Sequence, residues 1–223
     1  AALLLAGAPA PARAWDDVGH MAIAAVAWRH LSPAARARAV AILRGAPGDA
    51  GLAQLRPAAG APDAADFALF VRAATWPDLV RDRRDYPRMR KYHRGPWHYA
   101  DTYWQFDAGR RAVPAAGPPP APENAAERIP ALYRVLADGA APAERRAVAL
   151  AWVLHLVGDV HQPLHVSARV SPEHPEGDRG GNLVRLGSGN LHSLWDDLFD
   201  RAGAERRPGD PRGRRSPRAR GAG

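Results

Sequence analysis

The stretch from Leu154 to His165 constrains the fold more than any other part of the chain. It places three histidines and one aspartate among residues that are otherwise almost wholly apolar. His155 and Asp159 are four residues apart, so on a helix they share one face. Burying two ionisable groups in an apolar run without partners costs several kcal/mol. The pattern favours a buried helix whose imidazole and carboxylate groups bind a divalent metal, with an ordinary core helix as the alternative.

Helical periodicity recurs along most of the chain. The spacing of apolar residues predicts helices over 15–31, 33–44, 63–76, 124–136, 142–157 and 191–199. Ser32 is the expected N-cap of the second helix and Asp63 that of the third, while Pro163 should end or kink the fifth. Residues 82–118 are expected to form long loops, and no alternating strand pattern of useful length is present. We therefore expect an all-α protein with one mainly helical domain and long loops.

The composition limits the kinds of metal site available to this chain. It has no cysteine, so a metal must be held by nitrogen and oxygen atoms. Of the formal net charge of +8, +6 falls within residues 201–223, and the rest of the chain is close to neutral. The basic balance therefore does not indicate a nucleic-acid-binding face on the folded part of the chain.

The two ends of the chain differ from its middle. Residues 1–14 combine a short apolar run with an A-x-A sequence at Ala12-Arg13-Ala14, which is typical of a secretory signal peptide that has lost its start. Cleavage there would make Trp15 the first residue of a secreted or periplasmic protein; the alternative is a disordered or cloning-derived leader. We expect residues 15–200 to form the folded domain. Residues 201–223, rich in Arg, Pro and Gly, should be a disordered tail.

Eight dispersed residues have side chains that can bind a metal through nitrogen or oxygen. They are His20, Asp78, His98, His155, Asp159, His165, His192 and Asp196. Two His-to-Asp pairs at four-residue spacing each present two ligands on one helix face. Because eight ligands exceed one tetrahedral site, the set predicts two or three metals in a helical cleft. Such clusters stabilise a phosphoryl group during in-line displacement.

The order of these residues resembles a known family. Five blocks occur in sequence: Trp15-x4-His20, Trp76-Pro77-Asp78-x2-Arg81, Trp97-His98-Tyr99-x-Asp101, His155-x3-Asp159-x5-His165 and Asn190-Leu191-His192-x2-Trp195-Asp196. Together they resemble the zinc-dependent, single-strand-specific nucleases of the S1/P1 family, which are related in fold to the zinc phospholipases C. The resemblance spans about residues 15–200. It implies a phospholipase C/nuclease-like architecture with a trinuclear zinc cleft.

The resemblance also implies how three Zn²⁺ ions are held. Asp78, His98, His155 and Asp159 would bind the first ion, and His165, His192 and Asp196 the second. The third would be bound by Asp159 as a bridge, by His20, and by the α-amino nitrogen and carbonyl oxygen of Trp15. Only cleavage after Ala14 frees that amine, so the family analogy and the signal-peptide pattern select the same bond.

By the same resemblance, the chain is a phosphodiesterase that cleaves single-stranded RNA and DNA to 5′-phosphate products and has 3′-nucleotidase activity. Asp78, Arg81 and Asp159 would be catalytic, with Arg81 donating to the phosphoryl oxygens. Arg81, Tyr99, Asp101 and Asn182 would contact the substrate, Tyr99 by stacking on an unpaired base. An ordinary surface arginine, core packing of Tyr99 against Trp97 and a turn-forming Asn182 are the alternatives.

Three questions stay open at the level of sequence. The family spacing after Asp78 places the next histidine ligand at His93, whereas the Trp-His-Tyr-x-Asp block selects His98, which we prefer with a five-residue loop insertion. A phospholipase C of the same architecture, or a catalytically inactive truncated zinc-binding homologue, is the alternative function. We expect single-stranded nucleic acid and 3′-mononucleotides as partners, a monomer, no stable protein partner and no membrane span.

Overall fold

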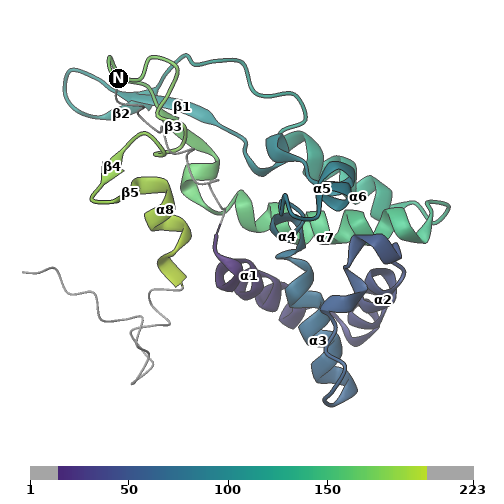
Figure 1. The fold of residues 1–223 in the computed structure, drawn as a ribbon. Helices are drawn as coiled ribbons and strands as arrows, with labels where there is room; N and C mark the ends of the chain where they lie inside the picture. The colour runs from purple at the N-terminus through teal and green to yellow at the C-terminus, as the bar shows by residue number, and fades with distance from the viewer. Residues whose placement is uncertain (1–14, 200–223) are drawn as a thin grey trace, which may run out of the picture.

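Helix α7 (Ala143–Asp159) is the central element of the fold, and its position follows from its sequence. Its carboxyl-terminal half is apolar on nearly every face, and Trp152, Val153 and Leu156 are all buried. A helix that is apolar all round must be covered on every side. In the computed structural model, which describes residues 15–199, five α-helices of the described part pack against it: α1 (Asp17–His30), α2 (Pro33–Arg44), α3 (Pro62–Ala73), α4 (Trp76–Leu79) and α6 (Ala125–Ala137) (Figure 1).

The helix starts follow from polar caps that the sequence displays. The Asp16 side chain accepts from the Gly19 amide at the start of α1, and the Ser32 hydroxyl accepts from the Ala35 amide at the start of α2. Asn124 caps α6 in the same way. Each bond satisfies one backbone donor that the first turn of a helix leaves unpaired. The predicted helices over 15–31, 33–44, 124–136 and 142–157 are thereby confirmed within one to three residues at their ends.

Three boundaries differ from the sequence-based expectation. Helix α3 (Pro62–Ala73) begins before Asp63, which lies in the first turn instead of at the N-cap, because Pro62 starts a helix without needing a partner for its nitrogen. Helix α8 (Leu191–Asp196) is shorter than predicted. Pro163 does not end α7, which stops at Asp159; it begins the short 3-10 helix η4 (Pro163–His165).

The prediction that residues 82–118 form only long loops is wrong. The structure has helix α5 (Tyr86–Tyr92), the 3-10 helix η3 (Gly95–His98) and strands β1 (Thr102–Phe106) and β2 (Ala112–Pro114) there. The signals that sequence reasoning missed are the Asp85 cap, whose side chain accepts from the Arg88 amide, and the β-branched and aromatic run Thr-Tyr-Trp-Gln-Phe of β1. Two further 3-10 turns span Gly48–Ala50 and Ala53–Leu55.

The strands form two small sheets at the carboxyl end of α7. In the first, β1 pairs antiparallel with β2, with Trp104 opposite Pro114, and parallel with β3 (Ser167–Arg169), with Tyr103 opposite Ala168. In the second, β4 (Arg185–Leu186) and β5 (Gly189–Asn190) form a hairpin that leads into α8. The protein is thus one mainly helical domain with minor sheets, and the fold-class prediction is confirmed.

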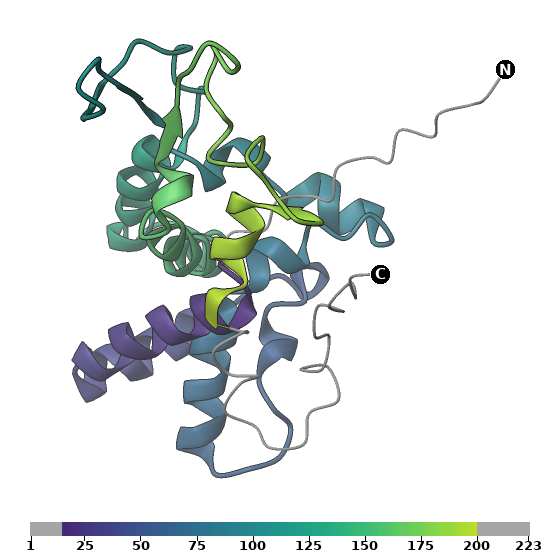
Figure 2. The ribbon, with the colours of Figure 1, turned by 90° about the vertical axis from the view of Figure 1, so that its left-hand side faces the viewer.

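A backbone hydrogen bond joins α8 to the rest of the domain. The Asp16 amide donates to the carbonyl of Asp196, which joins the start of α1 to the end of α8. Figure 2 shows α8 between α1 and the strands. Within residues 15–199, no helix is both long and apolar enough to cross a bilayer. The predicted signal segment 1–14 and the predicted tail 201–223 lie outside the described residues.

Candidate metal centre

The last turn of α7 supplies the two residues around which the site is built. His155 and Asp159 are both fully buried, and His155 Nε2 lies 3.2 Å from Asp159 Oδ2. The His155 Nδ1–H donates to the carbonyl of Ala74, at 2.8 Å. That bond fixes the ring so that Nε2 faces Asp159, the arrangement in which a histidine offers a lone pair to a metal.

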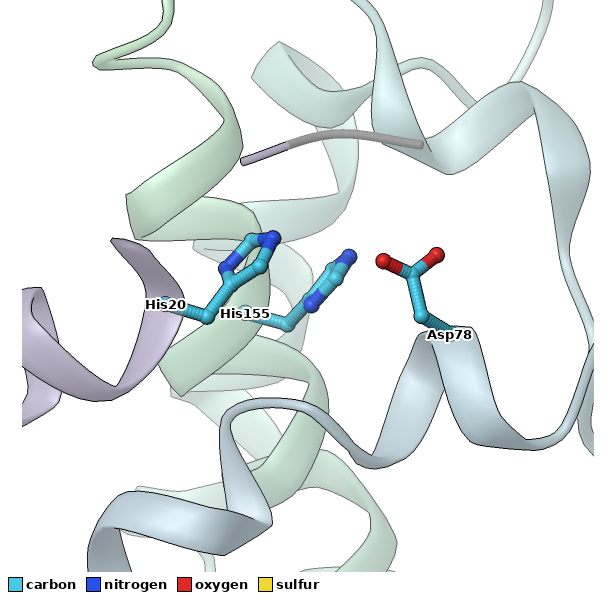
Figure 3. A group of neighbouring side chains, drawn as sticks. All are labelled: His20, Asp78 and His155. Atoms are coloured by element: carbon cyan, nitrogen blue, oxygen red, sulfur yellow. The ribbon is translucent and has the colours of Figure 1, made fainter. Parts of the chain in front are cut away.

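Residues from three helices converge to form the first metal-capable group. His20 of α1, Asp78 of α4 and His155 of α7 each offer a ligand atom, and these atoms lie within 4.8 Å of one another (Figure 3). The His20 and His155 rings stack at a centroid separation of 3.9 Å. Gly158 allows this approach, because a Cβ at that position would lie only 2.8 Å from His20 Nδ1.

A second group shares His155 with the first. It consists of His98, at the end of η3, together with His155 and Asp159, all buried. His98 Nδ1 lies 3.0 Å from Asp159 Oδ2 and 3.0 Å from His155 Nε2. Asp159 Oδ1 faces the other way, 3.5 Å from His20 Nε2. Asp159 is therefore in contact with histidines from both groups.

The third group joins η4 to α8 and comprises His165, His192 and Asp196. The Nδ1 atoms of both histidines contact backbone carbonyls, those of His98 and Gly180, at 2.8 and 2.7 Å. The amide of Gln162 donates to Asp196 Oδ1 at 2.9 Å and holds that carboxylate in place. Sequence reasoning missed Gln162, because a glutamine between two candidate ligands has no distinguishing pattern of its own.

Seven buried ligand-capable atoms of the metal groups have no hydrogen-bond partner. The buried atoms in this state are both ring nitrogens of His20, the Nε2 atoms of His98, His165 and His192, and one carboxylate oxygen each of Asp159 and Asp196. A buried polar atom left unsatisfied costs about 1–3 kcal/mol. Seven such atoms in one place require a shared partner, and a set of imidazole nitrogens and carboxylate oxygens fits a divalent cation.

The spacing within the third group agrees with this interpretation. His192 Nε2 and Asp196 Oδ2 lie 3.5 Å apart, and neither has a hydrogen-bond partner. Two ligands with zinc bonds of about 2.0–2.1 Å in tetrahedral geometry are about 3.3 Å apart. The separation suits two ligands of one ion better than a direct hydrogen bond between the two side chains.

Comparison with known proteins agrees with this arrangement. A family model described as S1/P1 Nuclease matches residues 15–210. The chain belongs to the S1/P1 nuclease family. Among curated proteins, Endonuclease 2 of Arabidopsis thaliana is 42% identical over 52 residues, and Endonuclease 4 of the same plant is 38% identical over 55 residues. These segments cover 22% and 23% of this chain but only 16% of each relative, so the relatives' own activities are not transferred on this basis.

Burial holds three histidines of the metal groups of this S1/P1 family member in the neutral form that binds metals. It lowers the pKa of His20 to about 3 and that of His165 to about 4, and it also lowers the pKa of His192. His155 differs: burial alone would lower its pKa, but the charge of Asp159 and a hydrogen bond to it raise the pKa to about 9. Without a metal, His155 is thus an imidazolium paired with the Asp159 carboxylate.

Metal binding to this centre must therefore release protons. Burial raises the pKa of Asp196 to about 8, so this carboxyl is also largely protonated at pH 7 when no metal is present. A cation that binds at His155 has to displace a proton from the ring, and a cation that binds at Asp196 has to displace one from the carboxyl group. The affinity of the centre for metal ions therefore falls as the pH is lowered, because protons compete with the metal for these two groups.

Trp15 lies beside the centre. Its side chain is buried, and its indole Nε1–H donates to the carbonyl of Gly158 at 3.0 Å, one residue before Asp159. The next residue, Asp16, is bonded through its amide to Asp196, as described above. Since Ala14 precedes Trp15 in this chain, the Trp15 nitrogen is a peptide nitrogen here and not a free amine.

The residues expected to contact substrate lie in two places, Arg81 beside Asp78 and the other three around one pocket. Arg81 Nη1 is 2.9 Å from Asp78 Oδ1. The Tyr99 ring lies 4.8 Å from that of His165, centroid to centroid. Tyr99, Asp101 and Asn182 line one pocket of about 280 Å³, together with residues that sequence reasoning did not single out: Tyr103, Leu164, Ala168, Glu176 and Arg179. Burial, with the charge of Asp178 adding to it, raises the pKa of Asp101 to about 6.

His93 and His98 occupy different positions relative to the metal groups. The two rings are 6.3 Å apart, and His93 is half-buried at the end of α5. Within the described residues, His98 belongs to one of the metal-capable groups and His93 to none. Helix α5 ends at Tyr92 and so places His93 outside these groups.

We expect His98→Ala to lose one bound metal and His93→Ala to keep the full number. The alanine at 98 removes a buried ring next to Asp159 and His155, whereas the alanine at 93 removes a ring outside the group. Metal content, measured by inductively coupled plasma mass spectrometry on both variants, tests which of the two histidines is a metal ligand. A metal deficit in the His93 variant, with none in the His98 variant, would reverse the assignment.

Proposed function

We propose that this S1/P1 family member is a secreted or periplasmic zinc enzyme. It hydrolyses phosphodiester bonds of single-stranded RNA and DNA to 5′-phosphate products, and it removes the 3′-phosphate from mononucleotides. The observation that supports this most is the cluster of three buried His/Asp groups, with Tyr99, which lines the neighbouring pocket, 4.8 Å from the ring of His165. Zinc bound in such groups lowers the pKa of water to near neutrality and stabilises charge on a leaving oxygen.

Each metal has a ligand set under this proposal. Asp78, His98, His155 and Asp159 hold the first zinc, and His165, His192 and Asp196 the second. Asp159, His20 and the free amine of Trp15 hold the third. A continuous centre is supported by two contacts: the His20 ring stacks on His155, and Asp159 Oδ1 lies 3.6 Å from His165 Nδ1 of the third group.

The chain's own residues orient the substrate. Arg81 is kept near the centre by Asp78 and can donate two parallel hydrogen bonds to a phosphoryl group. Tyr99 provides a ring for base stacking, which is tolerant of sequence and requires an unpaired base. The partly buried carboxyl group of Asp101 can hydrogen-bond the base edge, and Asn182 lies on the same pocket wall. Single strands are therefore favoured over duplexes.

The test is hydrolysis by zinc-loaded protein that begins at Trp15. We expect single-stranded DNA and RNA and a 3′-mononucleotide to be cleaved, duplex DNA to resist, and a chelator to reduce all rates to background until zinc is restored. Phosphatidylcholine serves as the comparison substrate. Preference for the phospholipid would favour the phospholipase C alternative, and three bound zincs with no turnover on any substrate would favour an inactive homologue.

A further inference from the structure

The pocket that contains Tyr99 borders the third metal group. The Tyr99 ring lies 4.8 Å from the His165 ring and 6.4 Å from the His192 ring, between centroids. Leu164, the residue before His165, also lines the pocket. A base that stacks on Tyr99 is therefore close to the metals that would hold its phosphate, and the polar groups around the pocket can contact the edge of that base.

The acid of this pocket that lies nearest the aromatic wall is Asp101. Tyr99, Asp101 and Tyr103 all line the pocket, as expected for alternate residues of an extended segment, which share one face. Within residues 15–199, the Asp101 carboxylate accepts no hydrogen bond. Burial and then the charge of Asp178 raise its pKa to about 6, so the group is mostly ionised at pH 7 and open to a ligand.

The cation among the residues that line the pocket is Arg179. Its φ of +54° lies in the left-handed region, which residues other than glycine rarely adopt and which persists where neighbouring contacts enforce it. The Arg179 carbonyl accepts from the Asn182 amide group at 2.9 Å, and the next carbonyl, that of Gly180, accepts from His192 Nδ1–H at 2.7 Å. The turn is thus fixed to the third metal group. Within the described residues, the exposed Arg179 guanidinium forms no hydrogen bond or ion pair.

Asp101 and Arg179 share one pocket of about 280 Å³ without pairing with each other. A guanidinium close to Asp101 would lower the pKa of its carboxyl group, whereas that pKa is raised and no cation offsets the increase. The two side chains therefore leave room between them for a ligand that satisfies both. Such a ligand has to offer donors to the carboxylate and acceptors to the guanidinium.

Among the common bases, guanine has this combination of groups. Its N1–H and exocyclic amine are adjacent donors on one edge, which suit the two oxygens of a carboxylate. Its O6 and N7 atoms accept two hydrogen bonds from one arginine. Adenine, cytosine and uracil each present only one donor group to a carboxylate, so one polar group of the pocket would lose its partner.

From this complementarity we propose that the pocket selects guanine. Asp101 accepts from N1–H and the exocyclic amine of the base, Arg179 donates to O6 and N7, and Tyr99 stacks on the face of the ring. The inference rests on the proposed nuclease function and adds a substrate class to it. The preferred substrates are guanosine 3′-monophosphate and single strands in which the phosphate under attack is the 3′-phosphate of a guanosine.

The test compares the four nucleoside 3′-monophosphates as substrates of zinc-loaded protein that begins at Trp15. We expect kcat/KM for the guanosine nucleotide to exceed the other three by about 5- to 150-fold, the discrimination that one good bidentate contact gives. Inosine 3′-monophosphate lacks the exocyclic amine and the 7-deazaguanosine nucleotide lacks the N7 acceptor, so each should lose part of the advantage. Equal kcat/KM values for the four natural nucleotides would overturn the proposal.

Arg179→Gly tests the arginine contact without straining the turn, because glycine adopts a φ near +54° freely. This variant should lower kcat/KM for the guanosine nucleotide towards the values of the other three. The matched control is Arg110→Gly, since Arg110 is also exposed and has a φ of +59°, but lies between β1 and β2 and does not line the pocket. It should keep the preference. An equal loss on all four nucleotides in Arg179→Gly would assign the arginine to the phosphate and contradict the base contact.

Asp101→Asn tests the acceptor. An amide presents one acceptor and one donor group, so it meets only one of the two guanine donors, and the advantage of guanosine over inosine should disappear. Glu176→Gln is the control, because Glu176 is a second acid that lines the pocket but is exposed. A loss of the preference in the Glu176 variant, with none in the Asp101 variant, would refute the assignment of Asp101.

Failure of the proposed function gives a different result, because zinc-loaded protein would then hydrolyse none of the nucleotides. The pocket is tested in that case by isothermal titration calorimetry with guanosine, adenosine, cytidine and uridine. Tighter binding of guanosine that is reduced in Asp101→Asn and in Arg179→Gly would support a guanine pocket in a protein that is not a nuclease. Equal binding of the four nucleosides would overturn the guanine pocket.

Discussion

Replacing Asp159 with alanine is expected to remove two bound metals together and to reduce hydrolysis to background. Asp159 contacts His98 and His155 through one carboxylate oxygen and His20 through the other, so its two oxygens face different metal groups. In the proposed ligand sets, no other side chain is shared between two metals. Zinc content per chain, measured by mass spectrometry alongside the rate on single-stranded DNA, should therefore fall from three to one.

The same substitution is expected to destabilise the metal-free protein. The paired charges of His155 and Asp159 lower the pKa of Asp159 well below its usual range and raise that of His155. Breaking a buried pair by removing one partner costs about 3–5 kcal/mol. Asp159→Asn keeps the shape of the side chain and removes its charge, so it separates loss of metal from loss of fold, with circular dichroism as the check on folding.

Asp66→Ala is the control for this experiment. Asp66 forms two ion pairs, with Arg44 at 2.7 Å and with Arg56 at 2.9 Å, but lies outside the metal groups. We expect this variant to lose some stability and to keep all its zinc. If Asp159→Ala or Asp159→Asn lost only one zinc, or none, Asp159 would not bridge two metals.

The predictable part of the site is the part encoded at short range. His155 and Asp159, and likewise His192 and Asp196, show their shared helix face directly in their four-residue spacing. Their proximity to His20, Asp78 and His98 is a tertiary property, since these lie on α1, α4 and η3. From the sequence, only the resemblance to the S1/P1 family placed these residues in one site; no local pattern did.

The sequence did not predict the short strands or the close packing that requires a glycine at position 158. Strands of two to five residues, such as β2 and β5, are shorter than any alternation pattern that a sequence can display. The need for glycine at position 158 appears only when α1 is packed on α7, because the atom that a Cβ would meet belongs to His20. The pairing of Tyr103 with Ala168 depends on the register of β1 with β3, which periodicity does not determine.

The chemical state of the Trp15 nitrogen is expected to decide whether the third metal binds. A protein of residues 15–223 should bind three zincs, and one of residues 14–223 should bind two. A peptide nitrogen shares its lone pair with the carbonyl group, so it cannot act as the neutral amine ligand that the third site requires. Trp15 is held in place by the Gly158 carbonyl in either case, so the two proteins differ in chemistry and not in packing.

The rate on single-stranded DNA should fall with the third metal. Loss of a direct ligand should cost at least the roughly 10- to 100-fold in metal affinity or activity that follows loss of an outer-shell partner. Acetylation of the Trp15 amine in the 15–223 protein is the matched control, because it removes the amine without adding a residue. The acetylated form should behave like the 14–223 protein. Three zincs and equal rates in all three forms would show that the third site does not use the amine.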